Sequence, residues 1–167
     1  MGLSTLGMLY LNAAVAASGM DRSSDAVRSA TALIDEAADV AHQQGADLNA
    51  DWTSFGPTNV ALHRVDVLVR FEDGWSALKA AGGLGDEAVG NLSKERRARH
   101  QVSIARAQLL TRGKDAAVEA LLSADALAPE EVRGRPSTVN LVKDVLGVHP
   151  QPSVALRRLA QQCGLHA

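Results

Sequence analysis

The sequence predicts an all-α fold, a superhelix of antiparallel helix pairs, in one domain that spans residues 1–167. Hydrophobic residues make up 46% of the chain, and much of that share is alanine, which favours helices and lets them pack closely. Aromatic residues make up only 3%, whereas a β-sandwich needs bulky aromatic and β-branched faces. Apolar residues also recur at steps of three and four, which is the spacing of one helix face.

Four helices are expected in the first half of the chain. Apolar faces predict one from Leu3 to Gly19 and a second from Asp25, as its N-cap, to Gly45, where glycine ends it. Pro57 suits the first position of a third helix that runs to about Arg70, because a missing N–H costs nothing there. The valines and leucines of this segment would also fit a strand, but its length and its helical neighbours favour a helix. A short fourth helix runs from Trp75 to Ala81.

Four more helices are expected in the second half. The segment from 82 to 90, which precedes these helices, contains four glycines and is expected to be the loosest part of the chain. Ser93 caps a long helix to about Arg112, and Gly113 turns the chain into a helix that ends near Ala128. Two further helices run from Pro136 to Leu146 and from about Ser153 to Cys163.

A repeat pattern relates these helices. Ala105 is followed at fixed spacings by Ala117, Leu121, Ala124 and Pro129, which resembles the 34-residue tetratricopeptide repeat. Small residues let the two helices of a pair approach, the large residue fills the gap between them, and proline closes the unit. Partial matches support a tetratricopeptide-like solenoid with irregular units. They are Gly7 with Tyr10, Ala30 with Ile34 and Ala37, and Val65 with Ala77.

A second resemblance concerns a family. It is carried by the segments WTSFGPTNVALHRVDVLV and SKERRARHQVSIARAQLLTRGKDAAVEALLSADALAPEEVR, and best by Phe55–His63 and Arg96–His100. These resemble the C-terminal helical-repeat region of actinobacterial helix-turn-helix (XRE-type) transcriptional regulators, and the likeness covers most of the chain. In such regulators a DNA-binding domain normally precedes this region. The resemblance therefore implies a regulatory domain that does not itself bind DNA, and it does not supply a ligand; a peptide or small-molecule effector is expected only from the candidate groove described below.

Charge and cysteine content limit the classes of binding partner and the cellular compartment that we expect. Lys and Arg number 17 and Asp and Glu number 19, so the net charge of −2 predicts no general affinity for nucleic acid or anionic membranes. A single cysteine, Cys163, cannot form an internal disulfide, which favours a cytoplasmic setting. The apolar N-terminal run has no Lys or Arg before it and is too short to span a membrane. We therefore expect neither a signal peptide nor a membrane anchor.

Most of the aromatic side chains lie in one short stretch. One interpretation is the wall of a ligand pocket, beside N–H groups of Thr58 and Asn59 that could bind an anion at a helix start. The other, which we favour, is a hydrophobic plug at the junction between two imperfect repeats. The residues concerned are Trp52, Phe55, Phe71 and Trp75.

The candidate binding site follows from the solenoid. Its third helix would turn polar side chains toward the concave groove, with aromatics at the edge and arginines reaching in from the next helix pair. The alternative for Asn59 and His63 is a structural hydrogen bond between helices. The expected ligand-binding residues are Trp52, Phe55, Asn59, Leu62, His63, Asp66, Arg99 and Arg106.

The sequence favours binding over catalysis. It contains no HExxH, CxxC, GxSxG or phosphate-binding glycine motif, so we expect no metal, no cofactor and no catalytic residue. Cys163 and His166 lack an evident orienting acid. The basic run from Lys94 to Arg106 lacks the interleaved aromatic residues of a nucleic-acid surface.

Two functions fit these observations. The first is a non-catalytic regulatory or interaction domain of a transcriptional regulator. The second is a stand-alone helical protein of a biosynthetic cluster that binds a small hydrophobic metabolite, with or without transforming it. A homodimer is also expected, because the final helix offers an apolar face rimmed by arginines. That face consists of Val154, Leu156, Leu159 and Ala160, with Arg157 and Arg158.

Overall fold

The structure is a computed structural model that describes residues 2–48 and 54–166. Within these residues the regular elements are all helices, apart from one isolated antiparallel bridge between Leu48 and Phe55, so the all-α prediction is confirmed. The chain divides into two compact units, Met1–Gly85 and Asp86–Ala167. The helices are α1 (Leu3–Met20), α2 (Ser24–Gln44), α3 (Pro57–Arg70), α4 (Gly74–Gly82), α5 (Asp86–Gly90), α6 (Lys94–Leu110), α7 (Lys114–Leu127), α8 (Pro129–Arg133), α9 (Pro136–Gly147) and α10 (Val154–Gln162).

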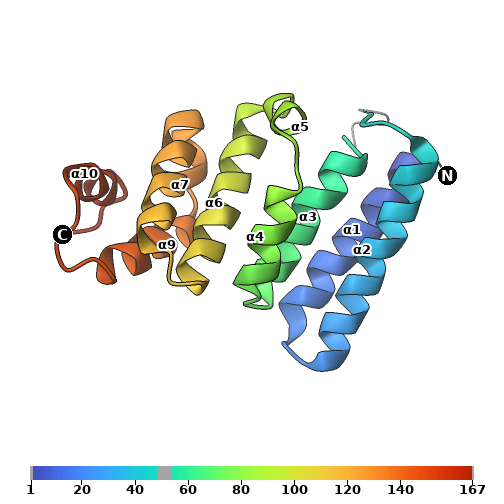
Figure 1. The fold of residues 1–167 in the computed structure, drawn as a ribbon, viewed down its shortest axis with the longest axis horizontal. Helices are drawn as coiled ribbons and strands as arrows, with labels where there is room; N and C mark the ends of the chain where they lie inside the picture. The colour runs from blue at the N-terminus through green and yellow to red at the C-terminus, as the bar shows by residue number, and fades with distance from the viewer. Residues whose placement is uncertain (1, 49–53, 167) are drawn as a thin grey trace. The chain divides into compact units, whose positions relative to one another are not determined.

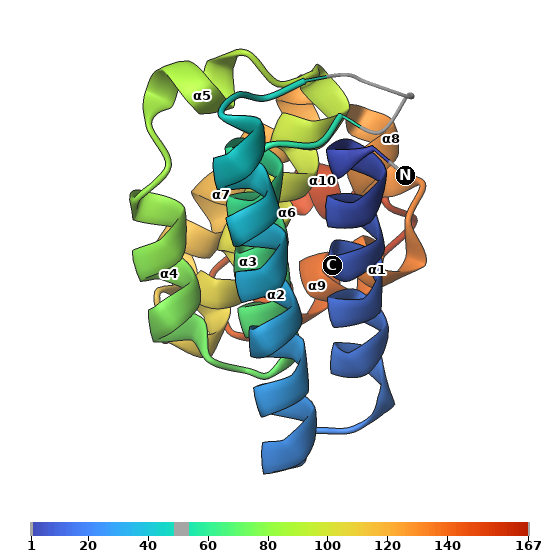
Figure 2. The same cartoon turned by 90° about the vertical axis from the view of Figure 1, so that its right-hand side faces the viewer.

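The first unit is built on the antiparallel pair of α1 and α2, which run side by side in Figures 1 and 2. Helix α3 packs against both of them, and α4 packs against α3. The apolar faces of α1, α2 and α3 meet in one core, to which the loop before α3 adds a phenylalanine. Its buried members are Leu11, Ala14, Ala30, Ile34, Ala37, Val40, Ala41, Phe55, Val60 and Val67.

The N-cap of α2 differs from the expected one. The Ser23 hydroxyl accepts a hydrogen bond from the Ala26 N–H at 3.1 Å, so Ser23 is the cap and the prediction of Asp25 was wrong. Asp25 lies in the first turn, where it pairs with Arg28. Both residue types cap helices well, and the residue with extended backbone takes the position. Gly45 ends α2 in the left-handed conformation, with φ of 79°.

The second unit is centred on the antiparallel pair of α6 and α7 (Figure 1), against which α8, α9 and α10 pack. Ser93 caps α6 as expected. Helices α5 and α8 were missed by the sequence, because five residues are too few to show a helical period. The buried core consists of Ala98, Val102, Ala105, Ala117, Ala120, Leu121, Ala124, Ala128, Val132, Leu141, Val142, Val145, Leu156, Leu159 and Ala160.

Helix α10 packs its apolar side into the core of the second unit. Leu156, Leu159 and Ala160 are buried in the core of the second unit, and of the apolar face that predicted a homodimer only Val154 is exposed. The argument for a dimer from an uncovered end of α10 is therefore wrong. The reason is that α10 turns its strongly apolar side onto α7 and α9.

The same type of turn joins the two helices of the α3–α4 pair and the two helices of the α6–α7 pair. In each turn a residue other than glycine adopts the left-handed conformation, Glu72 with φ of 60° and Arg112 with φ of 65°. The following residue donates its N–H to a carbonyl five residues back in both cases. These turns lie forty positions apart, as do Val65 and Ala105, and Ala77 and Ala117, all of which are fully buried. The same local geometry thus appears twice, in register with the small residues of the repeat.

Candidate functional site

Phe55 is a core residue of the first unit. Its side chain is 0% exposed and lies against Gly7 of α1, where an added Cβ would stand only 2.0 Å from the Phe55 Cζ. The ring therefore occupies space that the missing Gly7 side chain leaves open. Phe55 plugs the junction between the loop and the first helix pair and does not line an exposed surface.

The other aromatic residues have different surroundings. Phe71 is half-buried and packs against the same core, whereas Trp75 is 74% exposed at the start of α4. Trp52 lies outside the described residues. The aromatic stretch therefore does not form one cluster in the described part of the chain.

The start of α3 is already occupied by the protein's own groups. One Asp47 carboxylate oxygen accepts the Thr58 N–H at 3.0 Å and the other accepts the Thr58 hydroxyl. The Gln44 side-chain amide donates to the Phe55 carbonyl at 2.9 Å, and its oxygen accepts from the Ser4 hydroxyl at 2.7 Å. The Asp47 carboxylate therefore takes the position that an anion would hold at the Thr58 N–H, which counts against the interpretation that we did not favour.

The polar residues of α3 are mostly turned to internal contacts. Asn59 is 3% exposed, and its side-chain amide lies 3.3 Å from the Met8 sulfur of α1. The Asn59 carbonyl accepts a hydrogen bond from the His63 Nδ1 at 2.9 Å, so this nitrogen carries the proton. Leu62, His63 and Asp66 are half-buried, and Asp66 pairs with Arg70 at 3.0 Å. Of these contacts, that of Asn59 with Met8 joins two helices, as the structural alternative expects, whereas those of His63 and Asp66 lie within α3.

The second unit brings Arg99 to a buried carboxylate. Its Nε and Nη2 donate to the two Glu131 oxygens at 2.9 and 3.0 Å, and Arg135 donates to the same two oxygens. The Glu131 residue is 5% exposed, whereas the Arg99 and Arg135 side chains are 56% and 48% exposed. Hydrogen bonding to Arg99, then to Arg135, lowers the Glu131 pKa, and the carboxylate in turn raises the pKa of Arg99.

Arg106 joins the same side of the second unit. It lies seven residues after Arg99 on α6, and its Nη2 donates to the Ser137 carbonyl in the first turn of α9 at 2.8 Å. We call Arg99, Arg106 and Arg135 the arginine face. Sequence reasoning found the first two but missed Arg135 and Glu131. The signal available for those was the four-residue step between them within the segment EEVRGR.

The candidate residues therefore fall into two sets, one in each unit. Asn59, Leu62, His63 and Asp66 share α3 of the first unit, and Arg99 and Arg106 share α6 of the second. In the first set Asn59 is buried, and His63 and Asp66 make contacts within α3. In the second, charged groups remain partly exposed after their own hydrogen bonds are made.

Two further titratable groups are perturbed by burial. His100 on α6 is buried, its Nδ1 has no hydrogen-bond partner in the described part of the chain, and desolvation lowers its pKa. Burial also raises the pKa of the Cys163 thiol, which reduces its thiolate fraction at neutral pH. That shift opposes a nucleophilic role for Cys163.

Among the described residues, no group of three or more His, Cys, Asp or Glu side chains is placed to hold a metal ion. None of the described helices combines the length and apolarity needed to cross a membrane.

Comparison of the chain with protein-family models, with curated proteins and with solved structures finds no match.

Proposed function

We propose that this protein is a non-catalytic regulatory and interaction domain whose helix pairs stack into a tetratricopeptide-like superhelix. The observation that carries the proposal is the repeated hairpin: α3–α4 and α6–α7 share a left-handed turn residue and place small or branched residues in the same register. Stacked hairpins of this kind expose long helix surfaces, and such surfaces serve binding more readily than chemistry.

The family resemblance supports the same role. The segments that resemble the C-terminal regions of actinobacterial helix-turn-helix regulators include α3 and α6, which hold the candidate residues. In this proposal the domain works in the cytoplasm, responds to a peptide or a small molecule, and leaves DNA contacts to another domain. A homodimer remains part of the proposal, but it would need a surface other than the apolar side of α10.

Metabolite binding with chemical conversion has less support. That function relied on an aromatic-lined cavity, and Phe55 is enclosed in the core beside Gly7. The raised pKa of the Cys163 thiol also disfavours covalent chemistry at that residue.

A ligand screen tests the proposal. The purified chain would be screened by thermal shift against peptides and metabolites, and each ligand would be recovered and weighed by mass spectrometry. A ligand at about one hundred times its Kd should add about 2.7 kcal/mol to the free energy of unfolding. We expect a saturable ligand that is recovered unchanged. Recovery of a converted product, or no ligand from either class, would contradict the proposal.

A further inference from the structure

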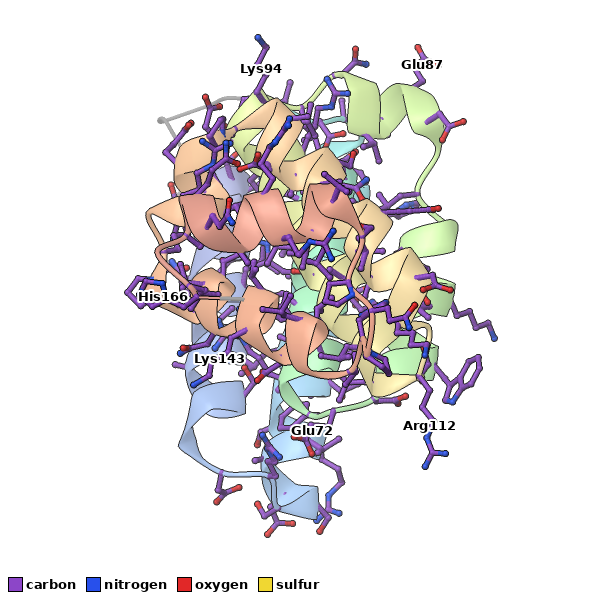
Figure 3. All side chains as sticks on the ribbon, turned by 90° about the vertical axis from the view of Figure 1, so that its left-hand side faces the viewer. Glu72, Glu87, Lys94, Arg112, Lys143 and His166 are labelled. Atoms are coloured by element: carbon purple, nitrogen blue, oxygen red, sulfur yellow. The ribbon has the colours of Figure 1, made fainter. Side chains whose placement is uncertain are left out.

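Helix α1 differs in composition from the other helices that the structure describes. Its 18 residues from Leu3 to Met20 include no Asp, Glu, Lys or Arg, whereas each of the other described helices contains at least one. Exposed charged side chains such as Glu87, Lys94 and Arg112 project outward from the second unit in Figure 3. A helix without charge on any side is usually enclosed by its neighbours. Helix α1 packs against α2 and α3, yet part of its surface stays exposed.

The exposed part of α1 is one strip along the helix, which we call the α1 face. Its members recur at steps of three and four residues, so they lie on the same side of the helix. Leu9 is 53% exposed, and Leu6 is half-buried. The α1 face consists of Leu6, Leu9, Asn12, Ala13, Ala16 and Gly19. An uncharged and mainly apolar strip of this kind is a surface that another protein can cover.

The charge of the first unit limits which partner can cover this face. Residues 1–85 contain five Lys and Arg against ten Asp and Glu, so the unit carries a net charge of −5. Two copies of such a unit repel each other unless they meet where charge is absent. Helices α2, α3 and α4 all contain charged residues, and α1 does not. A charged partner would gain nothing from α1, because that helix offers no opposite charge.

The sizes of the side chains along the α1 face favour a second copy of the same helix. Leu6 and Leu9 lie toward its start, and the small residues Ala16 and Gly19 lie toward its end. When two such helices run antiparallel about a twofold axis beside Asn12, each leucine lies opposite a small residue of the other copy. Large side chains opposite small ones fill the contact without a void. A partner with a different sequence would have no need of this reversal along the helix.

We propose that the α1 face is the contact surface of a weak homodimer, in which the α1 helices of two copies pack antiparallel with Leu9 opposite Ala16 of the second copy. This inference rests on the proposed function and gives its homodimer a surface. A helix of 18 residues is about 27 Å long and about 10 Å wide. Two such faces bury less than the about 1,200–2,000 Å² of a standard interface, so the dimer should dissociate in the micromolar range.

Sedimentation of the full chain tests this surface. Between about 1 and 200 µM the average mass should rise from that of a monomer toward that of a dimer. Leu9→Lys should raise the dissociation constant about tenfold or more, because it places two unpaired ammonium groups in an apolar contact. Ala16→Glu should do the same from the other end of the α1 face. Both residues are exposed, so the circular dichroism spectrum of each variant should match that of the wild type.

The two substitutions together test the antiparallel arrangement. In the Leu9→Lys/Ala16→Glu double variant each new lysine faces a new glutamate of the second copy, so the dissociation constant should return to within about threefold of the wild type. Within one helix the two positions lie about 10 Å apart, which is too far for an ordinary salt bridge. Parallel helices would place like charges together. A double variant that dimerises no more tightly than either single variant would overturn the arrangement.

Trp75→Lys is the matched control. It adds the same charge to the same unit, at an apolar residue that is 74% exposed on α4, and α4 packs against α3. Its dissociation constant should stay within about twofold of the wild type. A loss in Trp75→Lys equal to that in Leu9→Lys would show that the dimer uses another surface, and it would overturn the inference.

Other results also decide the question. If Leu9→Lys unfolds, Ala16→Glu still answers, because it changes a different exposed residue. A chain that stays monomeric up to about 200 µM would overturn the inference. Binding of neutral phospholipid vesicles by a monomeric chain would identify a lipid surface as the occupant instead. If the chain is a monomer while the ligand screen yields an unchanged ligand, this inference falls and the proposed ligand-binding function stands.

Discussion

At the scale of single residues, the contact between Phe55 and Gly7 leaves no room for a side chain at position 7. The two residues are 48 positions apart in sequence, yet the ring lies where a side chain at position 7 would be. Burial of a phenylalanine contributes several kcal/mol, so the absence of a side chain at Gly7 is a condition for much of the unit's stability.

Replacing Gly7 by alanine tests this contact. In an open helix, Gly→Ala stabilises by about 1 kcal/mol, but here the new Cβ should clash with the ring and cost about 1–3 kcal/mol. Gly19→Ala is the control, because it lies on the same helix with nothing within 4 Å of the added Cβ. Urea denaturation should give opposite signs for the two variants. Stabilisation by Gly7→Ala would mean that the ring lies elsewhere.

At the scale of elements, a buried carboxylate ties α8 to α6. Glu131 belongs to a five-residue helix that cannot persist by itself, and its two arginine partners hold that helix in place. The left-handed turns at Glu72 and Arg112 position the second helix of each hairpin, because they set the point at which that helix begins.

Acid should weaken the Glu131 contact. The Glu131 pKa lies below its ordinary value of 4.5 in the folded state. The ionised carboxylate therefore makes its full contribution to the free energy of unfolding above pH 4.5, and this contribution is lost as pH falls through the lower, folded pKa. Glu131→Gln should cost about 1–2 kcal/mol at pH 7 and should flatten the loss of stability below pH 4.5. Denaturation at a series of pH values measures both effects. Parallel pH curves for the two proteins would contradict this assignment.

The hairpin contact of α6 and α7 can be tested in the same way. Ala117 is fully buried, so Ala117→Leu should overpack the pair and cost about 1–3 kcal/mol. Ala126→Leu adds the same side chain at an exposed position of α7 and should change the free energy of unfolding by less than about 0.5 kcal/mol. Equal melting temperatures for Ala117→Leu and the wild type would show that the repeat register is wrong.

At the scale of the whole molecule, the described residues form two buried clusters, one in each unit. The buried cluster around Phe55 draws only on the first unit, and the cluster around Leu121 draws only on the second. Each unit therefore has its own source of stability, and damage to one need not spread to the other.

Phe55→Ala should destabilise the first unit and leave the second unit as stable as in the wild type. The lost ring should cost the first unit about 3–5 kcal/mol. Hydrogen exchange followed by mass spectrometry should show faster exchange in α1, α2 and α3, while α6 and α7 keep the protection of the wild type. Uniform loss of protection along the chain would instead indicate a single cooperative unit.

Most helices could be predicted from the sequence, because apolar periodicity and end signals such as Pro57, Ser93 and Gly45 are local. Contacts that join distant segments could not. The buried position of the Phe55 ring depends on the space beside Gly7, and the orientation of the Arg99 side chain depends on the Glu131 carboxylate, 32 residues away. The sequence thus suggested that Arg99 carries exposed charge, but it gave no sign that Glu131 would fix its orientation.

The position of Phe55 also has a consequence for synthesis of the chain. The ring that fills the space beside Gly7 belongs to the loop after the α1–α2 pair, eleven residues beyond Gln44. At about 5–20 residues per second, a ribosome needs about a second to add those residues. During that interval the nascent first pair has an open space beside Gly7 and an incomplete core. Slower translation of this loop would lengthen the time for which a chaperone, or another nascent chain, can reach it.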